Sequence, residues 1–207
     1  MLNPHAAGRG FTMVELLVAM AVIATLLAVG LPTMGTYLQN SKLGSATSTI
    51  YSALQTARAE AIRRNAPAEF VLTNTPVDTS DIANALTPSV GGRSWIVRAA
   101  SGATFTPVEI KAGTEGEGTA APAIVVAGAA SAPATFDGRV VFTSLGASID
   151  STGTPARVTF DITNPTGGLC VAAGGPIRCR RVVVSPGGQI SACDPAAIAG
   201  DSRACLP

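Results

Sequence analysis

An uninterrupted apolar run near the N-terminus constrains the fold of this chain more than any other feature. Residues 11–31 contain one charged side chain, Glu15. A helix rising about 1.5 Å per residue over this run would match a hydrocarbon core of roughly 30 Å. A carboxylate inside such a segment costs about 2.5–3.5 kcal/mol on insertion scales, and no cation lies within the run to pair with it. The run therefore predicts a membrane-spanning helix with a functional glutamate.

The residues before the run have the composition of a short leader. Residues 1–10, MLNPHAAGRG, are polar and weakly basic, and they end in Gly10 directly before the apolar residues. An ordinary secretory signal peptide is cut after its apolar region. Cleavage between Gly10 and Phe11 would instead keep the apolar run and give it a new N-terminal amine.

Leader and run together resemble a known processing signal. The pattern Gly10-Phe11-Thr12-x-x-Glu15, followed by about twenty apolar residues and Pro32, is similar to the class III signal of type IV pilins and type II secretion pseudopilins. The resemblance implies that prepilin peptidase cuts after Gly10 and methylates the amine of Phe11. It also implies an ion pair between Glu15 and the Phe11 amine of a neighbouring subunit during assembly. A signal anchor and a cleaved secretory peptide are the alternatives, and neither explains Glu15.

The helix is expected to continue beyond the apolar run and to pack on a domain. Pro32 is tolerated within a helix near a membrane and predicts a kink there. After residue 37, apolar or small residues recur at spacings of three and four, as in an amphipathic helix. These residues are Leu43, Ala46, Ile50, Leu54, Ala57 and Ala61. We therefore expect a leader at 1–10, a membrane half at 11–32 and an amphipathic half at 33–65.

The end of this helix and its polar face can also be predicted. Asn65, before Ala66-Pro67, indicates the helix C-terminus. Arg58, Arg63 and Arg64 fall largely off the apolar stripe, so they are expected on a solvated face with local ion pairs to Glu60.

Beyond residue 66 the sequence changes to short β-branched runs separated by Gly, Pro and Asn, which indicates antiparallel sheets. The expected strands are Glu69–Thr73, Ser94–Ala99, Val108–Lys111, Ile124–Ala127, Arg139–Thr143, Ala156–Thr163, Gly168–Ala172, Ile177–Ser185 and Gly188–Ala192. The expected core comprises Trp95, Phe105, Phe142, Phe160 and Val183, facing Ile50 and Leu54. The predicted fold class is α+β, a long N-terminal helix packed on a β-rich domain at 66–207.

Two stretches of this domain are predicted to be surface loops. Residues 75–93 are polar with Pro and Gly, and residues 112–135 are rich in Ala, Gly, Thr and Pro. A short edge strand at residues 124–126 would fit within the second. By resemblance to pilin domains, both loops are candidate partner contacts.

All four cysteines lie near the C-terminus, at Cys170, Cys179, Cys193 and Cys205. In a chain exported across a membrane, this predicts two disulfides. Three pairings are possible, and the sequential one is favoured because Cys170 and Cys179 flank a Gly-Gly-Pro turn. Cys193 and Cys205 would then close the tail. A metal site would need closer ligand pairs or histidine, so none is expected.

The sequence offers little for catalysis. The single histidine, His5, would be removed with the leader, and no phosphate-binding, nucleophile-elbow or zinc-protease motif occurs. The formal net charge is +1, which gives no global attraction to nucleic acid or anionic lipid. We therefore expect neither an enzyme nor a cofactor.

Parts of the domain resemble the GspH/FimT subgroup of pilin-like proteins. These are the segment from Ala57 to Asn65, the stretch from Phe142 to Gly146, and the run from Arg180 to Ile190. Some FimT-like minor pilins bind DNA through a Gly-Arg-x-Arg motif, but residues 187–191 here read Gly-Gly-Gln-Ile-Ser. The remaining candidates for weak DNA contact are Arg178, Arg180, Arg181 and Arg203. On a strand, Arg178 and Arg180 would share one face and Arg181 the other.

The resemblance implies a minor pilin of the FimT/FimU kind, built into a type IV pilus, including its tip or initiation complex. The alternatives are a GspH-like pseudopilin of a type II secretion system and, disfavoured by the missing arginines, a DNA-binding minor pilin of natural transformation. Expected partners are other pilin or pseudopilin subunits, prepilin peptidase and the bacterial inner membrane. The domain at 66–207 would be periplasmic before the subunit enters the filament.

Overall fold

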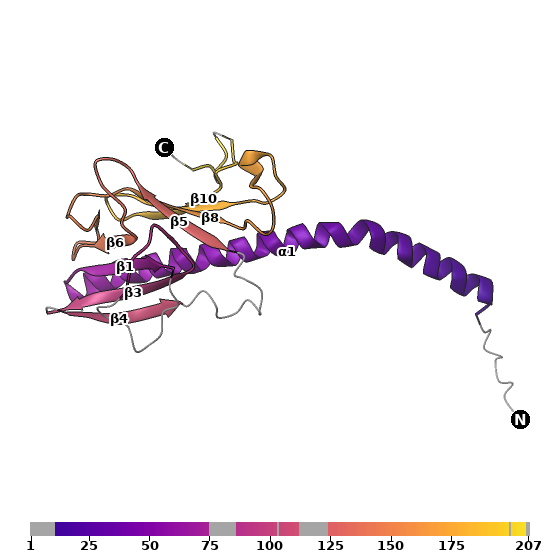
Figure 1. Ribbon diagram of the computed structural model, residues 1–207, viewed down its shortest axis with the longest axis horizontal. Coiled ribbons are helices and arrows are strands. Elements are labelled where there is room, and N and C mark those ends of the chain that lie inside the picture. Colours follow the sequence, from indigo (N-terminus) through magenta and orange to yellow (C-terminus); the bar gives the residue numbers. More distant parts are fainter. Residues whose placement is uncertain (1–10, 75–85, 103, 112–123, 199, 206–207) are drawn as a thin grey trace, which may run out of the picture. The chain divides into compact units, whose positions relative to one another are not determined.

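A computed structural model describes residues 11–74, 86–102, 104–111, 124–198 and 200–205, and the side chains of residues 29–33 and 111 lie outside this description (Figure 1). The predicted leader, with Gly10, and residues 75–85 and 112–123 of the two predicted loops also lie outside it. The chain divides into two compact units, Met1–Leu38 and Gln39–Pro207, which we describe separately.

One helix, α1 (Met13–Arg64), runs through both units, as the sequence predicts. It continues through position 32, so Pro32 does not end it, and the predicted kink there stays a prediction. Asn65 ends it in the left-handed conformation, with φ 49°. The N–H of Asn65 bonds to the carbonyl of Ile62, and the N–H of Ala66 bonds to the carbonyl of Ala61, each over 3.2 Å. This pair of bonds is the Schellman arrangement that closes helix C-termini.

The predicted apolar stripe forms the helical side of the core. The apolar residues of α1 that are buried are Leu43, Ile50, Ala53, Leu54, Ala57 and Ala61. Ala46, also predicted in the stripe, is partly buried and packs against them. Within the part of the chain that the structure describes, no helix has both the length and the apolar character needed to cross a membrane.

The first sheet has the strand order β4-β3-β1-β6-β7, with antiparallel pairs throughout. Its strands are β1 (Ala68–Thr73), β3 (Ser94–Ser101), β4 (Thr104–Lys111), β6 (Arg139–Phe142) and β7 (Ser148–Ile149). The central strand β1 pairs with β3 through Phe70 opposite Val97, and with β6 through Phe70 opposite Val140. Every residue of β1 is buried, so both faces of this strand are covered.

The second sheet has the order β10-β9-β8-β5-β2 and is also antiparallel. Its strands are β2 (Gly91–Gly92), β5 (Val125–Ala130), β8 (Val158–Thr163), β9 (Arg180–Val184) and β10 (Ile190–Cys193). The edge-strand prediction for residues 124–126 was wrong, because β5 pairs with β8 on one side and with β2 on the other. In Figure 1 the two sheets lie along the C-terminal half of α1.

Aromatic side chains join the sheets. Phe70 of β1 lies 5.7 Å from Trp95 and 5.4 Å from Phe160 of the other sheet, between ring centroids. Phe136 adds an edge contact to Phe160 at 5.5 Å. The core predictions for Trp95, Phe142, Phe160, Val183, Ile50 and Leu54 are confirmed by their burial. Phe105 was predicted wrongly: it is only half-buried, and its ring packs under the guanidinium of Arg98 at 4.5 Å.

Both predicted disulfides are present, Cys170–Cys179 and Cys193–Cys205. The strand predicted for Gly168–Ala172 is wrong, since a short 3₁₀ helix, η1 (Val171–Ala173), lies there instead. Within this described stretch of the chain, the strand-like pairing is a parallel bridge between Cys170 and Ile177. The pairing prediction therefore held although the antiparallel hairpin on which it was based does not form.

Candidate functional site

The start of α1 is fixed by Thr12. Its side-chain Oγ1 accepts the backbone N–H of Glu15 over 3.2 Å, and its carbonyl oxygen accepts the N–H of Leu16 over 3.2 Å. A threonine at this position satisfies one of the first N–H groups that have no partner within the helix. Thr12-x-x-Glu15 is also the sequence pattern of a capping box. The predicted cleavage site, Gly10-Phe11, therefore directly precedes the residue that starts the helix.

Glu15 lies exposed in the first turn of α1. A negative charge is favourable there, because the N-terminal end of a helix carries a partial positive charge. Among the described residues, no hydrogen bond or ion pair to the Glu15 carboxylate is found. The predicted ion pair to the Phe11 amine of a neighbouring subunit stays a prediction.

The N-terminal turns of α1 expose apolar side chains on all sides. The large apolar residues that are more than half exposed here are Phe11, Met13, Val14, Leu16, Leu17, Val18, Met20, Val22, Ile23, Leu26 and Leu27. A helix that is apolar all round is typical of a buried or membrane-embedded segment. Large exposed apolar surfaces are typical of sites that contact other proteins or a membrane.

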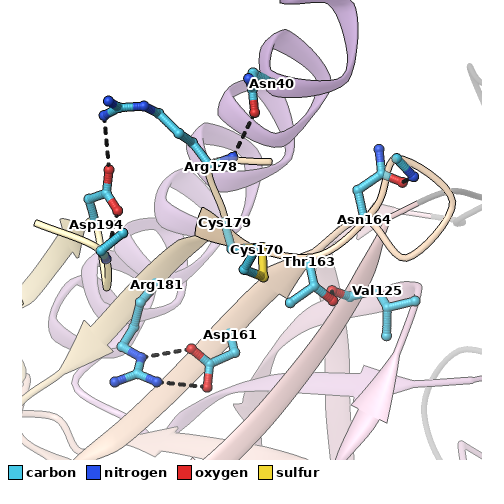
Figure 2. The surroundings of a disulfide bond; sticks show 12 residues. Asn40, Val125, Asp161, Thr163, Asn164, Cys170, Arg178, Cys179, Arg181 and Asp194 are labelled. Atoms are coloured by element: carbon cyan, nitrogen blue, oxygen red, sulfur yellow. Dashed lines mark hydrogen bonds and ion pairs between the residues drawn. A yellow bond between two sulfur atoms is a disulfide. The ribbon is translucent and has the colours of Figure 1, made fainter. Parts of the chain in front are cut away.

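A second candidate region holds the arginines predicted as DNA contacts. Arg178 and Arg180 both reach the carboxylate of Asp194, at 3.5 Å and 3.6 Å, and the Asp194 side chain is only 2% exposed. They share a partner, although Arg178 lies before β9 and so not on the strand for which a common face was predicted. Figure 2 shows Arg178 extending toward Asp194 beside the Cys170–Cys179 disulfide.

The other two arginines are also paired. Arg181 donates to both carboxylate oxygens of Asp161 on β8, at 2.7 Å and 3.0 Å (Figure 2), which places it apart from Arg180, as predicted. Arg203 pairs with Asp201 at 2.8 Å, and its guanidinium lowers the pKa of the Asp201 carboxyl to about 2. The four predicted arginines face three carboxylates, because Arg178 and Arg180 share Asp194, so most of their positive charge is compensated.

An open cavity of about 220 Å³ lies between α1 and the end of β10. It is lined by Gly44, Thr47, Arg180, Ala192, Cys193, Asp194 and Arg203. Within the described parts of the chain, no three His, Cys, Asp or Glu side chains come together as a metal site.

Two polar contacts that the sequence reasoning missed attach α1 to the β8–β9 connection. The side-chain oxygen of Asn40 accepts the backbone N–H of Arg178 over 2.8 Å (Figure 2). The side-chain oxygen of Gln39 accepts an amide N–H of Asn164 over 2.6 Å, and Asn164 is fully buried. The only sequence signal is a pair of polar amides directly before the apolar stripe, which does not identify partners more than 120 residues away.

A third missed contact involves Arg58, which was predicted to pair locally with Glu60. Arg63 and Arg64 do pair with Glu60, at 2.6 Å and 2.7 Å, but Arg58 donates through Nε to the carbonyl of Gly146 over 3.2 Å. Gly146 sits in the turn between β6 and β7. The arginine therefore connects the helix to a loop, and the prediction of a fully solvated face was wrong at this residue.

A comparison with solved structures finds two crystal forms, P65 and P21, of the type IV minor pilin FimU from Pseudomonas aeruginosa strain PAO1. Both are 16% identical to this chain, with TM-scores of 0.44 and 0.45. They cover 72% and 75% of this chain and 90% of each FimU chain. A comparison with curated proteins finds no match.

Two family profiles match the sequence. The prokaryotic N-terminal methylation motif matches residues 7–31, which contain the predicted cleavage site and Glu15. The profile described as type II transport protein GspH matches residues 46–188, from the buried part of α1 to the turn before β10. Because this second match spans more than half of the chain, the protein belongs to the GspH family.

Proposed function

We propose that this chain is a minor pilin of a type IV pilus, cut between Gly10 and Phe11 and built into the filament through its N-terminal helix. The observation that carries the proposal is the continuity of α1. One unbroken helix joins the N-terminal methylation motif at residues 7–31 to the GspH domain at residues 46–188. A processed, apolar helix on a folded domain is what a helix-packed filament requires.

Before assembly, residues 11–32 anchor the subunit in the inner membrane and the domain lies in the periplasm. The all-round apolar surface of the first turns supports this anchor. The cysteines support the compartment, because all four are in disulfides and these persist in oxidising surroundings. Prepilin peptidase and the other pilin subunits are the proposed protein partners.

The proposed mechanism is non-covalent. Cleavage creates an amine on Phe11, and Glu15 of one subunit pairs with this amine of the next. A buried charge that loses its partner costs about 3–5 kcal/mol, so one register of neighbouring helices is strongly preferred. No catalytic chemistry is needed for this function.

The replacement Glu15→Ala tests the mechanism. The variant should be processed normally but be absent from sheared filaments in an immunoblot, while N-terminal sequencing still begins at a methylated Phe11. Glu60→Ala is the matched control, since Glu60 is another carboxylate of α1 that pairs within its own chain. Filaments containing the Glu15→Ala subunit at the normal level would contradict the proposal.

A pseudopilin of a type II secretion system is the second candidate, because the family whose profile matches is described as type II transport protein GspH and the match is consistent with either function. Deleting the gene separates the two functions: loss of pili with intact secretion of folded proteins supports the minor pilin, and the reverse result supports the pseudopilin. DNA binding keeps only weak support, because each candidate arginine faces a carboxylate. A gel shift at low salt tests it.

A further inference from the structure

The connection between β8 and β9 contains a long stretch with no charged side chain. Residues 162–177, ITNPTGGLCVAAGGPI, lie between Asp161 and Arg178 without any Asp, Glu, Lys, Arg or His. Most of residues 165–176 are exposed, including Leu169 at 67% and Val171 at 39%. We call residues 165–177 the apolar loop. An exposed loop of this length on a water-soluble surface would normally carry charge.

The apolar loop is held in one conformation. The Cys170–Cys179 disulfide closes it, the N–H of Val171 donates to the carbonyl of Ile177 over 2.7 Å, and the N–H of Gly175 donates to the carbonyl of Cys170 over 3.0 Å. The backbone that carries the exposed side chains of Leu169 and Val171 is therefore held by a disulfide and by two hydrogen bonds. Because these apolar side chains are already held in place, they lose less conformational entropy when they contact a partner.

The position of the loop limits what it can touch. Its two ends are attached to α1 at Gln39 and Asn40, through Asn164 and Arg178. The apolar run ends at residue 31, eight residues before Gln39, which is at most about 12 Å of helix. This bound holds for any arrangement of the two units. The headgroup layer occupies roughly 5–7 Å on each side of a bilayer, so the attachment points lie at most about 5–7 Å beyond the lipid surface, and the loop touches lipid only if it projects toward the membrane by this distance.

We infer that the apolar loop rests on the phospholipid surface of the membrane in which the helix is anchored, with Leu169 and Val171 entering the boundary between headgroups and acyl chains. The inference depends on the anchor proposed above. Nucleic acid fits the loop poorly, because residues 162–177 contain neither a cation nor an aromatic ring on which a base could stack.

The test uses the full processed chain, one copy per lipid nanodisc, with a tryptophan placed on the loop by Leu169→Trp. The discs are made from ordinary phospholipid or from phospholipid brominated near the top of its acyl chains, which quenches nearby tryptophan. Leu145→Trp is the matched control. Leu145 is 88% exposed and neighbours Gly146, which is bonded to Arg58, about 27 Å along α1 from Asn40. The native Trp95 is buried and gives a constant background.

The expected result is a blue-shifted emission for Leu169→Trp that loses intensity in brominated discs, with no change for Leu145→Trp. Ala172→Trp, at another exposed loop position, should behave like Leu169→Trp and serves as a second probe if the first variant misfolds. Equal emission of both loop probes in the two lipids overturns the inference. So does a blue shift that develops only after other subunits are added, because the loop would then contact protein. Protein that fails to co-elute with the discs would instead disprove the anchor itself.

Discussion

Asn40 and Arg178 are 138 residues apart in sequence, yet the side-chain oxygen of Asn40 accepts the backbone N–H of Arg178 over 2.8 Å. The contact joins α1, at the first turn of the folded domain, to the base of a loop closed by Cys170–Cys179. Leu43, fully buried, begins the helical core three residues later. The point at which α1 enters the domain is therefore fixed by polar contacts first and by apolar packing after them.

The replacement Asn40→Ala should lower the free energy of unfolding by about 1 kcal/mol, because it removes one hydrogen-bond acceptor. Asn40→Asp keeps an acceptor oxygen in the same place and should lose less. Urea unfolding of the full chain in detergent micelles, followed by Trp95 fluorescence, measures both variants. Equal losses for the two would show that the bond to Arg178 contributes nothing.

Gly188→Ala should destabilise the domain by about 2 kcal/mol or more. Gly188 has φ 75°, and a Cβ there would overlap the carbonyl oxygen of Gly146, the same oxygen that accepts from Arg58. Gly187→Ala is the control, because the nearest atom to its Cβ would be Ser185 Oγ at 4.0 Å, and its effect should stay within about 0.5 kcal/mol. The two melting temperatures give the comparison, and similar values would argue against a required close approach of the two turns.

The two disulfides should protect different trypsin sites. Replacing Cys170 and Cys179 by serine frees the loop that ends at Arg178, and replacing Cys193 and Cys205 frees the tail that contains Arg203. Each pair closes a short loop and should contribute about 3 kcal/mol. Limited proteolysis with mass spectrometry should find early cleavage after Arg178 in the first variant and after Arg203 in the second. The same cleavage pattern in both would mean that the bonds act only on global stability.

Much of the fold could be predicted from local patterns. The apolar stripe and Asn65 define the buried length and the end of α1, since helix burial follows a 3.6-residue period and a left-handed residue closes the last turn. Short β-branched runs gave antiparallel strands. The sequential disulfide pairing was favoured because Cys170 and Cys179 flank a Gly-Gly-Pro turn, and it is confirmed although the predicted strands on either side of that turn do not form a hairpin.

The remaining features depend on partners that no local pattern specifies. The run Gly168–Ala172 has strand-like composition, but its backbone meets Ile177 in a parallel bridge and turns into η1. Phe105 looks like a core residue, yet it packs on Arg98, whose guanidinium pairs with Glu69 across β1 and β3. Arg58 reaches a carbonyl 88 residues away. Sequence spacing carries no information on such distant acceptors.

The free energy of unfolding should fall in acid partly because the Asp150 carboxylate becomes protonated. The hydroxyl of Thr152 and the N–H groups of Thr135, Thr154 and Thr152 donate to this buried carboxylate, and they hold the pKa of Asp150 well below its ordinary value. The folded state thus prefers the ionised form more than the unfolded chain does, whose pKa is about 3.9. The stabilisation is complete above that value and is lost as the pH falls toward the lower, folded pKa.

The replacement Asp150→Asn isolates this contribution, because the amide keeps one acceptor oxygen but cannot titrate. Between pH 6 and pH 2.5, the urea midpoint of the wild type should fall more steeply than that of the variant. Other carboxylates, such as Glu60, titrate in both proteins and cancel in the comparison. Parallel curves would show that Asp150 does not contribute to the acid sensitivity.

Thr12 should control how firmly the first turn of α1 is formed next to the proposed new amine. A positive amine at a helix N-terminus opposes the helix dipole, so the first turn depends on the cap at Thr12 and on the negative charge of Glu15. Thr12→Ala removes the Oγ1 that accepts the Glu15 N–H, a loss of about 1 kcal/mol, which corresponds to a roughly fivefold change in an opening equilibrium. Amide exchange of Glu15 in micelles should therefore quicken about fivefold in Thr12→Ala.

Thr12→Ser is the control, because it retains the hydroxyl and should leave the exchange rate of Glu15 nearly unchanged. An unchanged Glu15 exchange rate in Thr12→Ala would mean that the cap does not hold this turn, and that the position of the Glu15 carboxylate is set by neighbouring subunits alone.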